Sequence, residues 1–127
     1  MIGVVSDPVF MNHDTGGYHP ESPMRIHYVH TVFAGNDPDI LMMPPVKAAE
    51  SDIALVHSKG YMDLVRRSCR PGRYISLDPD TVCSEDSYET ALLAAGSVIR
   101  LVEAALSGEV TSGFASVAVV PLLYQGK

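Results

Sequence analysis

The sequence contains no tryptophan and only two cysteines, Cys69 and Cys83, among its 127 residues. Two cysteines are too few for a disulfide framework, so we expect free thiols in a reducing compartment, although the sequence gives no distance between them. Basic residues are also scarce, because nine Lys and Arg face 15 Asp and Glu for a net charge of -6. This deficit argues against nonspecific nucleic-acid binding and against attachment to an anionic membrane surface.

No apolar run reaches the roughly 18 residues that a membrane-spanning helix needs. The first residues lack a basic region and meet Asp7 at once, which is not typical of a secretion signal. We therefore expect a cytoplasmic protein. Hydrophobic residues make up 46% and charged residues 19%, a balance typical of globular chains, and the length predicts a single domain over residues 1–127.

The order of apolar segments predicts an α/β layer fold with right-handed crossovers. Residues 2–6 are short, apolar and rich in β-branched side chains, as in a buried strand. Residues 42–46 indicate an edge strand interrupted by prolines, and 113–123 form a nearly continuous apolar run, typical of a strand buried on both faces. Shorter helices are expected from Ser22-Pro23 to Gly35 and over residues 50–57 and 59–69.

The strongest helix signal runs from about Glu85 to Ser107, with Ser84 expected as its cap and Gly108 as its end. Its apolar residues recur at intervals of three and four, which predicts one buried stripe. The members of this stripe are Ala91, Leu92, Ala95, Ile99, Val102 and Leu106.

Possible metal or acid–base side chains gather in the long loop over residues 11–21. A histidine titrates near neutrality and a carboxylate can orient it, so this loop suits such a role, but a solvated loop is the favoured interpretation. The side chains concerned are His13, Asp14, Tyr18, His19 and Glu21.

Two further groups are weaker candidates. His27 and His30 lie three residues apart on a predicted helix, but two donors do not make a zinc site, so we expect one to be exposed and the other to pack or cap. Residues 78–81, Asp-Pro-Asp-Thr, form a turn signature, which is favoured over a ligand contact through the carboxylate of Asp78.

The stretch His19-Pro20-Glu21-Ser22-Pro23-Met24-Arg25-Ile26, with His30 beyond it, resembles the N-terminal signature of the histone deacetylase superfamily. That superfamily also includes acetoin-utilisation proteins and bacterial acetylpolyamine amidohydrolases. The resemblance covers residues 2–117 and leaves a divergent tail at 118–127. Its other parts follow in the family's order: Asp7-Pro8, His13-Asp14, Ala49-Glu50, Val56-His57-Ser58 with Tyr61, Leu77-Asp78-Pro79-Asp80-Thr81, Ala94-Ala95-Gly96 and Gly113-Phe114-Ala115-Ser116-Val117.

The resemblance implies the three-layer arginase/deacetylase α/β fold and a zinc-dependent amide hydrolase. We expect it here as a short sheet of about three parallel strands in the order 2-1-3, with flanking helices. By resemblance, His19 and Pro20 would lie on the rim of the pocket, and Asp78 would hold the substrate backbone there. Arg25 would line the internal channel behind the pocket.

The family's Arg-Pro-Pro-Gly-His-His motif is not found after residue 117, and the positions of its zinc ligands and its tyrosine have no match here. Amide hydrolysis by this route needs a Lewis acid and a base. We therefore expect no catalytic residue, no metal site, no cofactor and no deacetylase activity from the chain alone. We expect instead a non-catalytic module that forms oligomers or binds a ligand or another protein. Three alternatives remain: half of a deacetylase completed by another chain, a different α/β binding domain with accidental matches, and another activity that uses His13, Asp14 and His19.

The third strand of the family's sheet normally pairs with a later strand. The strand from Phe114 to Leu123 is therefore predicted to be an open, apolar edge that invites pairing with another chain. We expect a homodimer through this strand or through the long helix.

Overall fold

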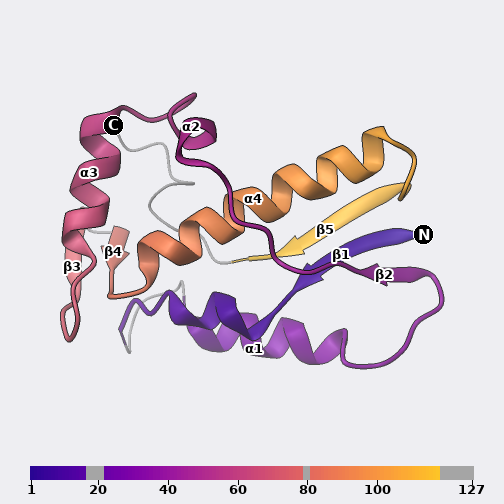
Figure 1. Ribbon diagram of the computed structural model, residues 1–127. Helices are drawn as coiled ribbons and strands as arrows, with labels where there is room; N and C mark the ends of the chain where they lie inside the picture. The colour runs from indigo at the N-terminus through magenta and orange to yellow at the C-terminus, as the bar shows by residue number, and fades with distance from the viewer. Residues whose placement is uncertain (17–21, 79–80, 118–127) are drawn as a thin grey trace.

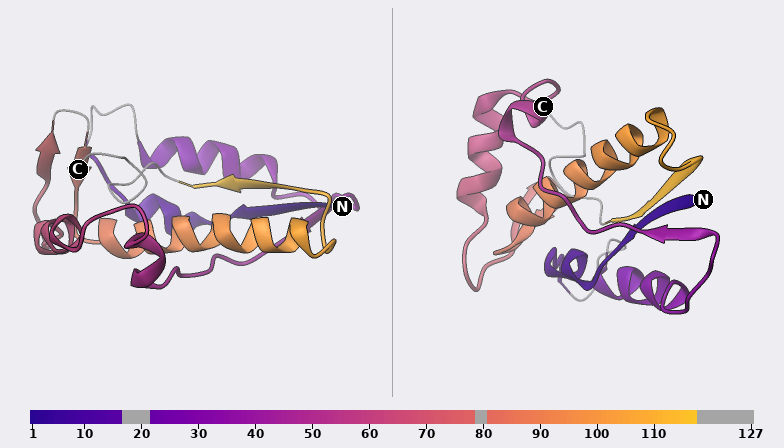
Figure 2. Two further views of the ribbon diagram at one scale, coloured as in Figure 1. Left: turned by 90° about the horizontal axis from the view of Figure 1, so that it is seen from above. Right: turned by 45° about the vertical axis from the view of Figure 1, so that its right-hand side comes forward.

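A parallel sheet of three strands forms the centre of the fold (Figure 1). In the computed structural model, which describes residues 1–16, 22–78 and 81–117, β1 (Ile2–Ser6) pairs with β2 (Ile40–Met42) and with β5 (Ser112–Ser116). The order β2-β1-β5 confirms the predicted order 2-1-3, because β5 is the third strand of this sheet. The helices α1 (Pro23–Val32) and α4 (Ser87–Leu106) cover its opposite faces (Figure 2).

The remaining elements gather beside the first turns of α4 (Figure 1). They are α2 (Glu50–Ile53), α3 (Lys59–Ser68) and an antiparallel hairpin of β3 (Ile75–Asp78) and β4 (Thr81–Cys83). Residues 79 and 80 of the predicted turn signature lie outside the described residues. A short 3-10 helix, η1 (Pro8–Asn12), follows β1 and begins where the Asp7 carboxylate accepts a hydrogen bond from the Val9 N–H at 2.8 Å.

Local signals in the sequence set several helix ends as predicted. The Ser22 hydroxyl accepts a hydrogen bond from the Met24 N–H, and Pro23 occupies the first turn of α1, where a missing N–H costs nothing. Gly108 follows α4 with a φ of 80°, a conformation that glycine adopts without strain. The helix α1 ends at Val32, before Gly35, and α2 is shorter than the predicted helix over residues 50–57.

Two strand predictions were wrong in part. The strand β2 lies at Ile40–Met42 rather than at 42–46, because the two prolines that follow cannot donate to a ladder. The strand β5 is not buried on both faces: its first residues are exposed, and Phe114 keeps 47% of its surface accessible. Within the described ranges β5 pairs on one side only, with β1, and residues 118–123 of the predicted strand lie outside those ranges.

The predicted stripe on α4 is buried only in its first half. Its members Ile99, Val102 and Leu106 are 38%, 52% and 84% exposed, whereas Leu101 and Ala104 are buried instead. The sheet determines which face of α4 is buried. Leu101 packs closely over Gly3 and Gly113, because a Cβ at either glycine would lie only 3.1–3.2 Å from the Leu101 side chain. The cap was also wrong: α4 begins after Asp86, and the N–H of Ser84 donates to the Ser87 hydroxyl at 2.8 Å.

The chain after β2 crosses α4 at Gly96. The Ala48 N–H donates to the Leu92 carbonyl at 2.9 Å, and the Val46 N–H donates to the Ser97 hydroxyl at 3.2 Å. A Cβ on Gly96 would stand 2.1 Å from the Val46 carbonyl oxygen. Only glycine allows this close approach of backbone to helix. Among the described residues, no helix is long and apolar enough to cross a membrane.

Candidate functional site

Of the residues that the resemblance assigned to the pocket, the structure describes two. His19 and Pro20 lie outside the described residues. Asp78 is the last residue of β3, where its backbone pairs with Thr81 of β4 at the turn of the hairpin. Arg25 lies on an exposed side of α1. Their roles at the rim and in the channel stay predictions.

A cleft of about 350 Å³ lies between the end of η1, the segment before β3 and the segment before α4. The Tyr74 hydroxyl donates to the Asp14 carboxylate at 2.8 Å, and this hydrogen bond raises the pKa of Tyr74. The cleft offers three carboxylates and one guanidinium to a polar ligand. Its lining residues are Met11, Asn12, Asp14, Gly72, Arg73, Tyr74, Ser84, Glu85 and Asp86.

Behind this cleft, a buried polar cluster joins the loop after η1 to the start of α4. His13 Nδ1 lies 2.7 Å from Ser87 Oγ, and the Asp14 N–H donates to the Ser84 hydroxyl at 3.2 Å. Ser87 has no exposed surface, so no substrate reaches its hydroxyl. This serine–histidine pair therefore positions the loop rather than acting as a nucleophile and base. The sequence singles out His13 and Asp14, but no local pattern predicts that His13 contacts Ser87, which lies 74 residues further along the chain.

The two histidines of α1 contact different parts of the protein. His30 Nδ1 lies 2.8 Å from Ser6 Oγ at the end of β1. His27 is exposed, and its ring meets that of Tyr28 edge to face at 5.5 Å. The favoured interpretation of this pair, one histidine exposed and the other packed, is confirmed.

The residues of the Val56-His57-Ser58 motif shape the start of α3. The Ser58 hydroxyl accepts a hydrogen bond from the Tyr61 N–H at 3.1 Å and caps the helix. His57 is buried, and its ring stacks on that of Tyr61 at 5.3 Å. Both motif residues therefore have a structural role in this chain.

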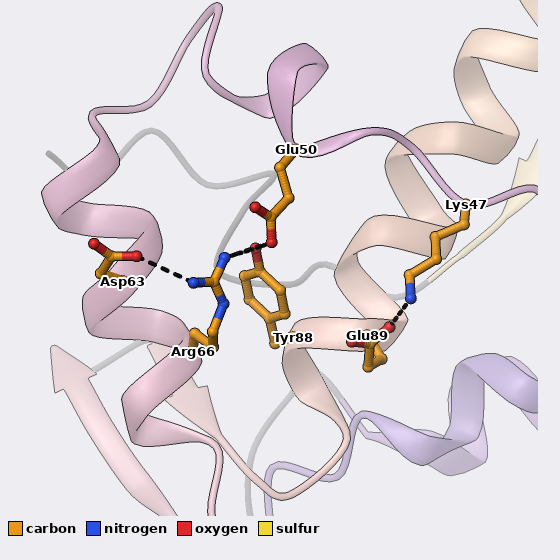
Figure 3. A network of polar contacts seen from close by, with 6 residues as sticks. All are labelled: Lys47, Glu50, Asp63, Arg66, Tyr88 and Glu89. Atoms are coloured by element: carbon orange, nitrogen blue, oxygen red, sulfur yellow. Dashed lines mark hydrogen bonds and ion pairs between the residues drawn. The ribbon is translucent and has the colours of Figure 1, made fainter.

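A polar network fastens α2 and α3 to α4 (Figure 3). The Arg66 guanidinium pairs with the Glu50 carboxylate and donates to the Tyr88 hydroxyl at 3.0 Å, and that hydroxyl donates to Glu50 at 2.8 Å. The hydrogen bond from Tyr88, followed by that from Arg66, lowers the pKa of Glu50. Arg66 also pairs with Asp63 at 3.2 Å, and a separate ion pair joins Lys47 to Glu89. Sequence reasoning missed this network, because its partners are far apart along the chain.

The described residues do not fit a zinc ion. Over residues 1–16, 22–78 and 81–117, no group of three or more His, Cys, Asp or Glu side chains is placed to hold a metal. A zinc site in a protein takes at least three such donors. What these residues supply is a polar cleft and a hydrogen-bonded cluster behind it.

Residues 19–121 match the family model of the histone deacetylase domain. The chain belongs to the histone deacetylase family. The match confirms the resemblance carried by the sequence motifs, and it excludes the alternative of a different α/β domain with accidental matches.

Related proteins show how much of a deacetylase these residues represent. Histone deacetylase 5 of Arabidopsis thaliana is 33% identical over 126 residues, covering 91% of this chain and 19% of that protein. A probable deacetylase of Archaeoglobus fulgidus is 29% identical over 121 residues, covering 91% of this chain and 33% of that protein. The chain thus spans about a fifth to a third of the length of these curated relatives.

A solved structure confirms the predicted fold. The crystal structure of the HDA15 HD domain superposes with a TM-score of 0.79 at 27% sequence identity. The match covers 91% of this chain and 35% of that one. The chain is therefore a fragment of a histone deacetylase domain, with the family's α/β architecture.

Proposed function

We propose that residues 1–127 form a deacetylase-domain module that shapes one side of a substrate entrance and does not hydrolyse acetylated amines unaided. The observation that carries the proposal is that three of the four described histidines are held by other side chains, whereas the fourth, His27, lies exposed on α1. His13 bonds to Ser87, His30 to Ser6, and His57 stacks on Tyr61. A general base must instead reach the water that it activates.

The rim is proposed from the family resemblance. His19, Pro20 and Asp78 would contact the substrate there, and Arg25 would line the channel behind it. The backbone position of Asp78, at the end of β3 and opposite Thr81 of β4, supports this role, because binding residues gather where strands end in loops.

Turnover measurements on the purified chain test the proposal directly. The chain is loaded with Zn²⁺ and incubated with an acetyl-lysine peptide and with an acetylated polyamine, and the rate is compared with that of the same zinc buffer alone. We expect the two rates to be equal. Turnover above the buffer rate that falls in a His13→Ala variant, while circular dichroism shows the variant to be folded, would contradict the proposal.

A second candidate function is half of a zinc-dependent deacetylase that another polypeptide completes. Two exposed apolar surfaces favour it: the open edge of β5 with Phe114, and the face of α4 with Ile99, Val102 and Leu106. Such surfaces on a soluble domain mark contacts with further polypeptide. Zinc bound, and acetyl-lysine hydrolysed, only in a mixture with the remaining part of a relative's domain would support this candidate over the first.

The same two surfaces support a homodimer as the partner of the isolated chain. Its contact would be the strand from Phe114 to Leu123 or the helix α4. In a twofold dimer, the same surface of each chain would contact its counterpart on the other chain, so that no strand edge would be left unpaired.

A further inference from the structure

An exposed group of arginines lies where α3 ends and the chain turns toward β3. Four of the nine Lys and Arg residues fall between residues 66 and 73, in a chain with a net charge of -6. Arg67, Arg70 and Arg73 are exposed, and within the part of the chain that the structure describes no carboxylate forms an ion pair with them. We call these three residues the arginine turn.

The end of α3 places two members of the arginine turn on nearly the same side of the helix. Arg67 Nε donates to the Asp63 carbonyl at 3.2 Å, and Arg70 Nε donates to the Arg67 carbonyl at 3.1 Å. These two carbonyls are four residues apart, so they lie about 6 Å apart along the helix axis. Among the contacts of the described residues, each guanidinium uses only its Nε, so its two terminal nitrogens are available to a ligand.

A tight turn then brings Arg73 close to Arg70. The Arg73 N–H donates to the Arg70 carbonyl at 3.3 Å, and Gly72 has a φ of 70°. Residues 70–73, Arg-Pro-Gly-Arg, thus have proline second and a positive-φ glycine third, which is the pattern of a type II β-turn. The first and fourth Cα atoms of such a turn lie within about 7 Å of each other. The helix end and the turn therefore gather three guanidinium groups on one short stretch of chain.

The surroundings leave the charge of the arginine turn uncompensated on the side of α3. Asp63 is the nearest carboxylate on that helix, and it pairs with Arg66, which also pairs with Glu50. Figures 1 and 2 show the segment between α3 and β3 at the outer end of the molecule, beside the β3–β4 hairpin and away from the sheet β2-β1-β5. A partner can therefore approach the arginine turn without displacing an element of the fold.

The charges on the other side of the arginine turn favour a compact anion over a long one. Arg73 also lines the cleft that contains Asp14, Glu85 and Asp86. A nucleic acid or an anionic membrane would extend past Arg73 and meet these carboxylates. A single phosphate monoester instead concentrates about two negative charges on three acceptor oxygens, and arginine binds such oxygens in pairs.

We propose that the arginine turn is a docking site for a phosphorylated serine or threonine in a segment of a partner protein. The phosphate oxygens would accept hydrogen bonds from the terminal nitrogens of Arg67 and Arg70, and Arg73 would add a third positive charge. Clusters of arginine are a recurring means of recognising phosphorylated peptides. The inference does not rest on the function proposed above, because it uses none of the residues of the proposed rim or channel.

Amide NMR spectra of the 127-residue chain test this site. The isotope-labelled chain is titrated at low ionic strength with a short peptide that carries one phosphoserine between glycines, and separately with the same peptide unphosphorylated. We expect the phosphopeptide to shift the amide signals of residues 66–74. Its affinity should be at least about tenfold higher than that of the unphosphorylated peptide.

Variants with matched charge changes locate the binding groups. The double variant Arg67→Gln/Arg70→Gln should bind the phosphopeptide at least about tenfold more weakly. Arg67→Lys/Arg70→Lys keeps the charge but loses the planar guanidinium, and should still bind at least about threefold more weakly. The control is Lys59→Gln, which removes one exposed positive charge at the other end of α3 and should change the affinity by less than about twofold.

Three results would overturn the proposal: equal affinity for the two peptides, equal affinity of the double glutamine variant and Lys59→Gln, or tighter binding to a DNA duplex or to anionic phospholipid vesicles at the same phosphate concentration. Circular dichroism checks that each variant is folded. If the double variant is not, Arg73→Gln decides, because the Arg73 side chain makes no hydrogen bond among the described residues. An unchanged affinity of Arg73→Gln would then refute the site.

Discussion

His13 and Ser87 bind each other through a 2.7 Å hydrogen bond although 74 residues separate them. Both side chains are buried. Together with Ser84, they fix the loop after η1 against the first turn of α4, and so hold one wall of the cleft.

Replacing Ser87 by alanine should therefore destabilise the fold. The substitution leaves the His13 ring nitrogen and the Ser84 N–H without this partner, and a buried polar group that loses its partner costs about 1–3 kcal/mol. Urea unfolding followed by circular dichroism measures this loss. The matched control is Ser51→Ala, at an exposed position of α2, which should change the free energy of unfolding by no more than about 0.5 kcal/mol. Equal effects of the two substitutions would contradict the role given to Ser87.

Gly96→Ala should be more damaging than any other glycine-to-alanine change in a helix of this chain that the structure describes. The added Cβ would lie 2.1 Å from the Val46 carbonyl oxygen and 2.4 Å from the Ala48 nitrogen, so backbone must move. We expect a loss of about 3 kcal/mol or more in the free energy of unfolding. Gly60→Ala in α3, where no atom lies within 4 Å of the new Cβ, should instead stabilise by about 0.5 kcal/mol. A variant Gly96→Ala as stable as Gly60→Ala would show that the crossing is looser than described.

The carboxylate of Glu50 makes stability depend on pH in the acid range. Its pKa is lowered from 4.5 in the folded chain, first by the Tyr88 hydroxyl and then by Arg66. A carboxyl with a lowered folded pKa contributes stability above its unfolded pKa and loses that contribution as the pH falls through its folded pKa. We expect Glu50→Gln to be less stable than the unmodified chain at pH 6, with a difference that shrinks below pH 4.5.

Urea midpoints over a pH series measure this difference. When both proteins also carry Tyr88→Phe, the difference in stability caused by Glu50→Gln should vary less with pH. The Tyr88 hydroxyl is the first cause of the lowered pKa of Glu50, and this substitution removes it. A difference between Glu50→Gln and the unmodified chain that stays constant from pH 6 to pH 3 would rule out this assignment.

Light scattering should separate the two proposed dimer contacts. At tens of micromolar we expect the mass of a dimer for the unmodified chain. Phe114→Lys places a charge on the open edge of β5, and Val102→Lys places one on the exposed face of α4. The substitution that yields a monomer identifies the contact, and a monomer from the unmodified chain would refute the dimer. The Phe114 ring also contacts the Phe33 ring, with 5.8 Å between the ring centroids. Circular dichroism should therefore check that Phe114→Lys is still folded.

Sequence reasoning succeeded where a short stretch of chain carries its own signal. Ser22 and Pro23 mark the start of α1, and Gly108 marks the end of α4, because capping is a matter of adjacent backbone groups. The order of the sheet came from the family motifs rather than from periodicity. That resemblance could name Asp78 and Arg25, but it could not place their side chains.

The failures have a common physical cause, which is that burial and pairing depend on the neighbouring elements. Ile99 and Val102 continue an apolar period, yet the sheet contacts Leu101 because Gly3 and Gly113 leave room there. No local pattern encodes such docking.

The crossing at Gly96 also bears on how the chain acquires its structure. The segment after β2 finds its hydrogen-bond acceptors at Leu92 and Ser97, and β1 lies between β2 and β5, which is the last strand described. A nascent chain that has emerged only as far as β2 lacks these partners, and pairings between distant segments form slowly. We therefore expect the fold to be completed during synthesis only after α4 and β5 have left the ribosome, and until then β1 lacks its β5 partner.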